Sequence, residues 1–164
     1  MTCWAYPRRM DSEQRSASLV PELDVTNLAR SMTFYVDVVG FSIVFERPAE
    51  RFAYLAIGGA ELMLQDAAGP GRRFRTAPLE HPFGRGINLQ VAVPDVDATY
   101  AAVLASDIEP VIPLEDRWYD VDVVTPSGRW AAVGPMKAGN RQFVVADPDG
   151  YLLRFYTSLS TSRA

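Results

Sequence analysis

The two halves of this chain repeat one another, and the repeat limits the possible folds more than any other feature of the sequence. Adding 68 to a residue number leads from Val20 to Asn88 and from Asn27 to Asp95. Further along each half, adding 91 leads from Phe52 to Phe143, from Gly59 to Gly150 and from Met63 to Arg154. A chain of 164 residues has room for two small modules that share one core.

Each half is predicted to contain a strand, a helix and three further strands. In the first half, alternation predicts strands at 18–25, 41–47, 51–57 and 60–65, and a helix that starts at Thr26 or Asn27 and ends at Gly40. In the second half, strands are predicted at 87–93, 108–112, 141–146 and 151–156, with a helix capped by Asp95. The last two strands are joined by Asp-Pro-Asp-Gly, a sequence typical of a hairpin turn.

The predicted fold class is therefore α+β, with two tandem βαβββ modules that form one concave, partly open mixed sheet with helices on its outer face. We expect a flexible extension at 1–17, the first module at 18–66, a connecting loop at 67–86, the second module at 87–157 and a tail at 158–164. The second module contains an insertion at 114–139 without a clean period. Its tryptophans and its Gly-Pro sequence predict an ordered excursion over a site.

Composition excludes several classes of partner. A formal net charge of −4 argues against nucleic acid, which needs clustered Lys and Arg. No apolar run approaches the roughly 18 residues that span a membrane. Cys3 is the only cysteine and cannot form an internal disulfide, so we expect a cytoplasmic protein.

Strand parity separates the predicted sheet into two faces. The side facing the helices should hold the apolar set Leu19, Leu23, Leu62, Leu64, Ile87, Leu89, Val91, Leu153 and Phe155. The other parity mixes polar and apolar groups, among them Glu22, Asp24, Glu61, Met63, Gln65, Asn88, Gln90, Arg154 and Tyr156. This second face is either simply wetted or, because convergent polar groups stand among apolar ones, a ligand cleft.

These residues resemble the vicinal oxygen chelate superfamily over about 18–156. The resemblance is carried by the helix sequence at 27–41, Asn-Leu-Ala-Arg-Ser-Met-Thr-Phe-Tyr-Val-Asp-Val-Val-Gly-Phe, and by Asp-Pro-Asp-Gly-Tyr at 147–151. Within the superfamily the chain is most similar to bleomycin resistance proteins, whose characteristic segments appear at 20–23, 52–55 and 139–143. That resemblance implies paired βαβββ modules and a cleft on the concave side.

Metal-dependent members of the superfamily hold their ion with one residue on each of four strands. Matched by motif, these positions are Val20, Met63, Asn88 and Arg154. Valine cannot bind a metal, a thioether is a soft ligand, and arginine places a permanent positive charge where the ion would lie. His81, the only histidine, falls in the connecting loop, so no metal, cofactor or catalytic residue is predicted.

The resemblance instead implies a metal-free protein that sequesters a bleomycin-like antibiotic. Such proteins are homodimers that exchange their first strand, and their clefts lie between subunits. Pro21 falls at the exchange hinge, although a proline there also suits an ordinary edge strand or bulge.

The predicted ligand-binding residues combine aromatic walls with polar groups. Aromatic rings stack on a flat heteroaromatic cation, and carboxylates attract it. We expect Trp118 and Tyr119 to act as a lid, and Arg154 with Tyr156 to hold an anionic group or the Glu61 carboxylate. Core packing, loop packing and surface solvation are the alternative roles. The full predicted set is Phe45, Glu46, Phe52, Glu61, Met63, Asn88, Gln90, Trp118, Tyr119, Arg154 and Tyr156.

A second hypothesis is an enzyme that acts on a small carbonyl compound. Glu61 or Glu22 would be the general base, and Arg154 would hold an enolate oxygen. A third is a module that uses the same cleft for another natural product or for a protein.

Overall fold

The computed structural model of the protein describes residues 17–121 and 136–163. These residues form two four-stranded mixed sheets, where the sequence predicted one sheet. Sheet A has the order β1-β4-β3-β2 and contains β1 (Glu22–Val25), β2 (Ser42–Arg47), β3 (Phe52–Ile57) and β4 (Ala60–Asp66). Sheet B has the order β5-β8-β7-β6 and contains β5 (Asn88–Ala92), β6 (Ile112–Val121), β7 (Met136–Ala146) and β8 (Leu152–Arg163). Two pairs of strands run parallel, β1 with β4 in sheet A and β5 with β8 in sheet B.

Strand pairing supports the predicted repeat and corrects one of its correspondences. Glu22 lies opposite Met63, and the residues 68 and 91 positions further on, Gln90 and Arg154, also lie opposite one another. The third strands differ by one residue, because Phe52 pairs with Gln65 whereas the partner of Tyr156 is Gln142. The structural counterpart of Phe52 is therefore Gln142 and not Phe143.

Two capped helices connect the strands. Asn27 caps α1 (Leu28–Met32), its side chain accepting a hydrogen bond from the Arg30 amide at 3.0 Å, and the chain continues as the π-helix η1 (Thr33–Val38). Asp95 caps α2 (Val96–Ala105) as predicted, and a 3₁₀ turn, η2 (Pro48–Glu50), joins β2 to β3. Neither helix in the described part of the chain is long and apolar enough to cross a membrane.

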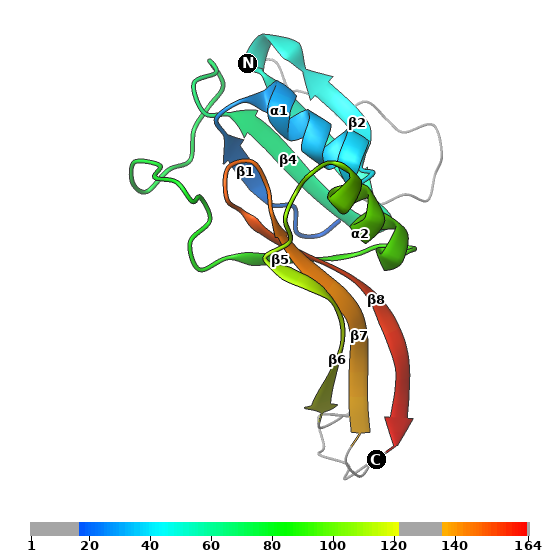
Figure 1. The fold of residues 1–164 in the computed structure, drawn as a ribbon. Helices are drawn as coiled ribbons and strands as arrows, with labels where there is room; N and C mark the ends of the chain where they lie inside the picture. Colours follow the sequence, from blue (N-terminus) through cyan, green and yellow to red (C-terminus); the bar gives the residue numbers. More distant parts are fainter. Residues whose placement is uncertain (1–16, 122–135, 164) are drawn as a thin grey trace, which may run out of the picture.

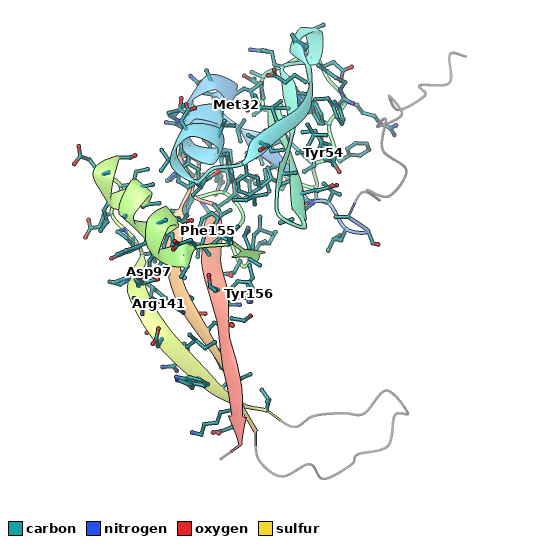
Figure 2. All side chains as sticks on the ribbon, turned by 90° about the vertical axis from the view of Figure 1, so that its right-hand side faces the viewer. Met32, Tyr54, Asp97, Arg141, Phe155 and Tyr156 are labelled. Atoms are coloured by element: carbon teal, nitrogen blue, oxygen red, sulfur yellow. The ribbon has the colours of Figure 1, made fainter. Side chains whose placement is uncertain are left out.

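Both helices cover the same side of the two sheets, and one core lies beneath them (Figures 1 and 2). The prediction was right for six core residues, Leu23, Leu62, Leu64, Val91, Leu153 and Phe155, which are all buried. It was wrong for Leu19 and Ile87, which are 85% and 54% exposed. Both precede the strands to which they were assigned, because β1 begins only after Pro21 and β5 begins at Asn88.

Strands β6, β7 and β8 continue past the helices as a three-stranded arm (Figure 1). The sequence predicted a strand at 108–112, an aperiodic excursion at 114–139 and a tail at 158–164, and the structure differs at all three. Strand β6 starts only at Ile112. The two ends of the predicted excursion belong to the paired strands β6 and β7, and β8 includes most of the predicted tail. The sequence of the arm does not alternate between apolar and polar residues, because no helix covers one face of the arm and makes it a core face. Trp130 lies outside the described residues.

The base of the arm is attached to α2 through Arg141. This guanidinium binds Asp97 on the helix and Asp116 on β6, each at 2.8 Å. Its hydrogen bonds lower the pKa of Asp97. All three side chains are exposed, so the pairs orient the arm more than they stabilise the fold.

The predicted hairpin turn at 147–150 is present, and it joins the two modules. Gly150 has a φ of +93°, and the Asp147 carboxylate accepts hydrogen bonds from the amides of Asp149 and Tyr151, both at 2.9 Å. The buried Asp149 carboxylate reaches the first module, where it accepts from the Thr26 amide at 3.1 Å and from the Thr26 hydroxyl. Arg30 on α1 binds the same carboxylate at 3.1 Å.

A second link between the turn and the first module is fully buried. The hydroxyl of Tyr35, on η1, donates to Asp147 at 3.0 Å. Burial, together with the nearby Asp147 charge, raises the pKa of Tyr35 well above its ordinary value. The neutral hydroxyl therefore remains the donor over the whole physiological pH range.

The turn predicts a stability defect that is specific to Asp149. Asp149→Asn removes the charge that three donors share, and hydrogen bonds to a charged acceptor contribute about 1.5–3 kcal/mol. We expect the free energy of unfolding, measured in urea, to fall by roughly that amount. Asp37→Asn, the same change at an exposed carboxylate, is the matched control and should stay within about 0.5 kcal/mol of the parent. Equal effects of the two substitutions would contradict this role.

Candidate functional site

Each sheet has a second face, which we call its open face, on the side away from the helices. Figure 2 shows Tyr54 and Tyr156 on this side and both helices on the other. Cross-strand pairing places one row, Phe45, Tyr54, Met63 and Glu22, across sheet A. The corresponding row of sheet B is Ile112, Val144, Arg154 and Gln90. In this row sheet A presents aromatic rings and a carboxylate, whereas sheet B presents aliphatic groups, one amide and a cation.

Aromatic rings stack in a short series across sheet A. Phe45 stacks on Tyr54 with 4.9 Å between ring centroids, and Phe52 lies 6.0 Å from Phe45. The Arg47 guanidinium lies 3.7 Å from the centroid of Phe52. The sequence prediction named Phe45 and Phe52 but missed Tyr54. The sequence could have indicated Tyr54, because it lies two residues after Phe52 and therefore on the same face of the strand.

The acidic groups of sheet A have distinct partners. Glu61 accepts from the Tyr54 hydroxyl at 2.5 Å and from the Ala17 amide at 3.0 Å. Burial, and secondarily the charge of Asp24, raises the pKa of Glu22. Glu46, predicted to bind ligand, pairs with Ala53, a residue of the helix-side core, and is exposed on that side of the sheet. It therefore does not belong to the open face.

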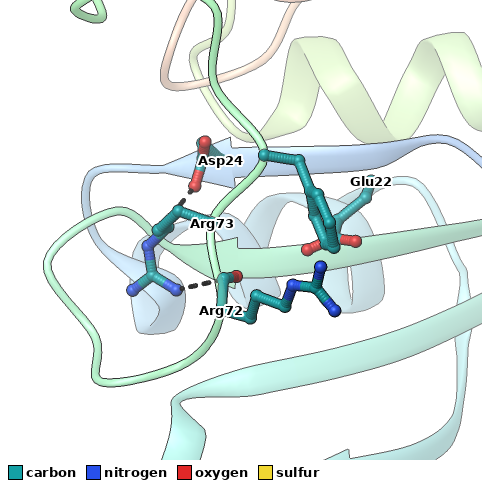
Figure 3. A pocket seen from close by; sticks show the side chains of 5 residues that line it. Glu22, Asp24, Arg72 and Arg73 are labelled. Carbon is teal, nitrogen blue, oxygen red and sulfur yellow. Dashed lines mark hydrogen bonds and ion pairs between the residues drawn. The ribbon is translucent and has the colours of Figure 1, made fainter.

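The connecting loop brings arginines to the acidic edge of sheet A. Arg75 binds Asp24 at 2.7 Å, and Arg73 lies 4.0 Å from the same carboxylate. A hollow of about 60 Å³ remains between the loop and β1 (Figure 3). It is lined by Glu22, Asp24, Arg72, Arg73 and Phe74. The carboxylate of Asp24 is therefore paired with arginines of the loop.

On sheet B, the side chain of Arg154 binds Gln90. The two lie opposite each other, and an Arg154 terminal nitrogen donates to the Gln90 side-chain oxygen. Asn88 pairs with Leu152 instead. Within one chain, Arg154 donates to Gln90 and Glu61 accepts from Tyr54, so the described residues do not bring Arg154 and Glu61 together. An enzyme that combines a Glu61 base with Arg154 gains no support from this arrangement.

The four positions that hold a metal in related proteins do not fit an ion here. Val20 precedes β1, and the remaining three supply a thioether, an amide and a guanidinium. A guanidinium repels a cation and cannot donate a lone pair. Within residues 17–121 and 136–163, no group of three or more His, Cys, Asp and Glu side chains could hold a metal ion.

The two predicted lid residues lie on opposite faces of the arm. Trp118 pairs with Gly139 on the helix side and packs so closely that a Cβ on that glycine would come within 2.7 Å of the indole. Tyr119 pairs with Ala138, on the face continuous with the open face of sheet B. Both are partly exposed, at 42% and 38%. Only Tyr119 is placed to extend that face.

Comparison with known proteins agrees with this architecture. Residues 21–155 match the model of the Glyoxalase/Bleomycin resistance protein/Dioxygenase superfamily. Bleomycin resistance proteins from Geobacillus stearothermophilus and Staphylococcus aureus are 25% identical to this chain over 149 residues, which cover 87% of this chain and 97% of theirs.

Solved structures share the fold. TioX from Micromonospora sp. ML1 is 26% identical with a TM-score of 0.61, and the match covers 86% of this chain and 98% of TioX. A glyoxalase/bleomycin resistance protein/dioxygenase from Alicyclobacillus acidocaldarius is 15% identical with a TM-score of 0.56, covering 91% and 96% of the two chains. The latter likeness concerns the fold alone.

The bond between Tyr54 and Glu61 predicts a measurable cost for Tyr54→Phe. The change leaves the ring in place and removes the donor to a half-buried carboxylate, so we expect a loss of about 1–2 kcal/mol in the free energy of unfolding. Tyr119→Phe, at an exposed tyrosine of the arm, is the matched control and should be close to neutral. If urea unfolding gave the same midpoint for both variants, the bond would not stabilise sheet A.

Proposed function

Because this chain belongs to the glyoxalase/bleomycin resistance protein/dioxygenase superfamily, we propose that it is a metal-free binding protein that sequesters a bleomycin-type antibiotic. The observation that carries the proposal is the aromatic series on the face of sheet A away from the helices, where the partly exposed Phe45 packs on the buried Phe52 and Tyr54 next to the Glu61 carboxylate. Stacking and cation–π contacts on such a surface retain a flat, positively charged heteroaromatic group. Binding alone prevents the drug from reaching its target, so the function requires no catalytic residue.

We further propose that the cleft forms between two copies of this chain. Sheet A supplies aromatic rings and carboxylates, and sheet B supplies Gln90, Arg154 and Tyr156. A homodimer that brings the open face of sheet A in one copy against sheet B of the other encloses a ligand on both sides. In that assembly β1, which begins directly after Pro21 and here pairs with β4 of its own chain, is the strand exchanged between copies.

The antibiotic should bind through the aromatic series. In isothermal titration, we expect metal-free or copper-loaded bleomycin to bind the full chain. Phe45→Ala should weaken this binding roughly tenfold, because stacking and apolar burial are both lost. The matched control is Trp118→Ala, which removes an aromatic ring from the helix side of the arm and should leave the affinity unchanged. Absence of heat and of a thermal shift at high drug concentration would exclude bleomycin as the ligand.

The dimer makes a separate prediction. Sedimentation of the purified chain at micromolar concentration should give twice the mass of 18.1 kDa that the sequence specifies. Glu22→Lys, on the edge strand of sheet A, would place a positive charge opposite an Arg154 across the shared cleft and should shift the equilibrium toward the monomer. Glu46→Lys is the matched control on the helix side. A monomer at all concentrations would contradict the shared cleft.

A further inference from the structure

Arg154 has an unused donor that is buried. One terminal nitrogen of its guanidinium donates to the Gln90 side-chain oxygen, which fixes the direction of the planar group. The Nε–H of the same side chain is buried and has no hydrogen-bond partner. Among the ion pairs of the described residues, none involves Arg154. A buried donor of this kind normally has a partner in the working protein.

Gln142 has an unused acceptor on the same face. Its side chain is 4% exposed, and its amide nitrogen donates to the Glu115 carboxylate at 3.5 Å. Its carbonyl oxygen is buried and has no partner. The orientation of this amide is determined by Glu115, because reversing it would direct the carbonyl oxygen at a carboxylate. The oxygen therefore faces away from Glu115.

The two unused groups are neighbours on the sheet. Gln142 pairs with Tyr156 and Val144 pairs with Arg154, so Gln142 and Arg154 are diagonal neighbours on adjacent strands. Such residues lie about 7–8 Å apart along the sheet, which one small planar group can bridge. Val144 and Tyr156 stand between them and give that group an apolar surface to lie on.

We propose that this part of sheet B, formed by Arg154, Gln142 and Gln90, is a recognition site for a planar carboxamide group. The amide oxygen accepts from the Nε–H of Arg154, and an amide N–H donates to the side-chain oxygen of Gln142. A carboxylate would satisfy Arg154 alone, since it has no hydrogen to donate and would approach Glu115. An ammonium or guanidinium group would satisfy Gln142 but would be repelled by Arg154.

The site rests on the proposed function, because it specifies a second chemical group on the same ligand. Sheet A selects a flat cation, and sheet B selects an amide presented at a distance from it. A ligand that carries both groups would bind between two copies of the chain, with its cationic part on sheet A and its amide on sheet B. The inference therefore narrows the ligand class to amide-bearing, peptide-like molecules with a cationic aromatic part.

Benzamide is the probe, because it carries one primary amide on a small apolar ring. In nitrogen-15 NMR spectra of the full chain, the Arg154 Nε–H signal should shift on titration with benzamide and saturate. N,N-dimethylbenzamide keeps the acceptor but lacks the donor, and we expect it to bind at least tenfold more weakly. Benzoate, an anion without a donor, should also bind at least tenfold more weakly.

Two variants test the named groups. Gln142→Leu removes the acceptor and should abolish the preference for benzamide over its dimethyl analogue. Arg154→Lys removes the Nε donor and should lower benzamide affinity at least tenfold, whereas Arg117→Lys, an exposed arginine on β6, should not. Thermal unfolding of each variant establishes that it is folded. If Arg154→Lys does not fold, Gln142→Leu still tests the proposal.

Three outcomes would overturn the proposal, and a fourth would overturn only the proposed function. Equal shifts with all three probes would show that Gln142 does not contact the amide, and preferential binding of benzoate would show that the site binds anions. If the Arg154 signal changed only on dilution from dimer to monomer, the two groups would belong to a contact between copies. Failure of bleomycin to bind, with benzamide binding retained, would remove the antibiotic while leaving the amide site in place.

Discussion

The Asp149 carboxylate holds this molecule together. It lies in the last turn of the second module, yet its hydrogen bonds go to Thr26 and Arg30 at the start of the first helix. A buried carboxylate must be compensated by donors, so this turn can be buried only where it meets the first module. Asp147, two residues earlier in the same turn, adds the bond from Tyr35. This polar link between the two modules, beside their shared core, therefore depends on a tetrapeptide that in isolation would be only a hairpin turn.

Much of the architecture could be predicted from the sequence, because local rules and tertiary packing agree there. Asn27 and Asp95 cap helices, Gly150 adopts a positive φ, and the paired positions Glu22–Met63 and Gln90–Arg154 follow the repeat. The correspondence failed by one residue in the third strands. Periodicity specifies which residues share a face, but only the ladder specifies which residue of the neighbouring strand lies opposite.

The site was less predictable for physical reasons. Phe45 and Glu46 were both predicted as ligand contacts, but adjacent residues of a strand point to opposite faces, and the ladder places only Phe45 on the open face. The pairing of Asp24 with Arg75 depends on a loop residue that lies 51 positions further along the chain. Both open faces combine groups that are individually ordinary, and their chemical contrast is visible only once the cross-strand rows are known.

Tolerance to insertion and deletion should differ sharply along the chain. In η1 the Val39 amide bonds to the carbonyl of Phe34, five residues earlier, so this helix contains one residue more per turn than an α-helix. Deleting a single residue there would restore α-helical geometry and rotate the preceding turn by about 100°. Thr26 and Arg30 would then leave Asp149. Changes of length should be tolerated in the exposed part of the connecting loop at 76–82, whereas this one helix must keep its extra residue for the modules to remain joined.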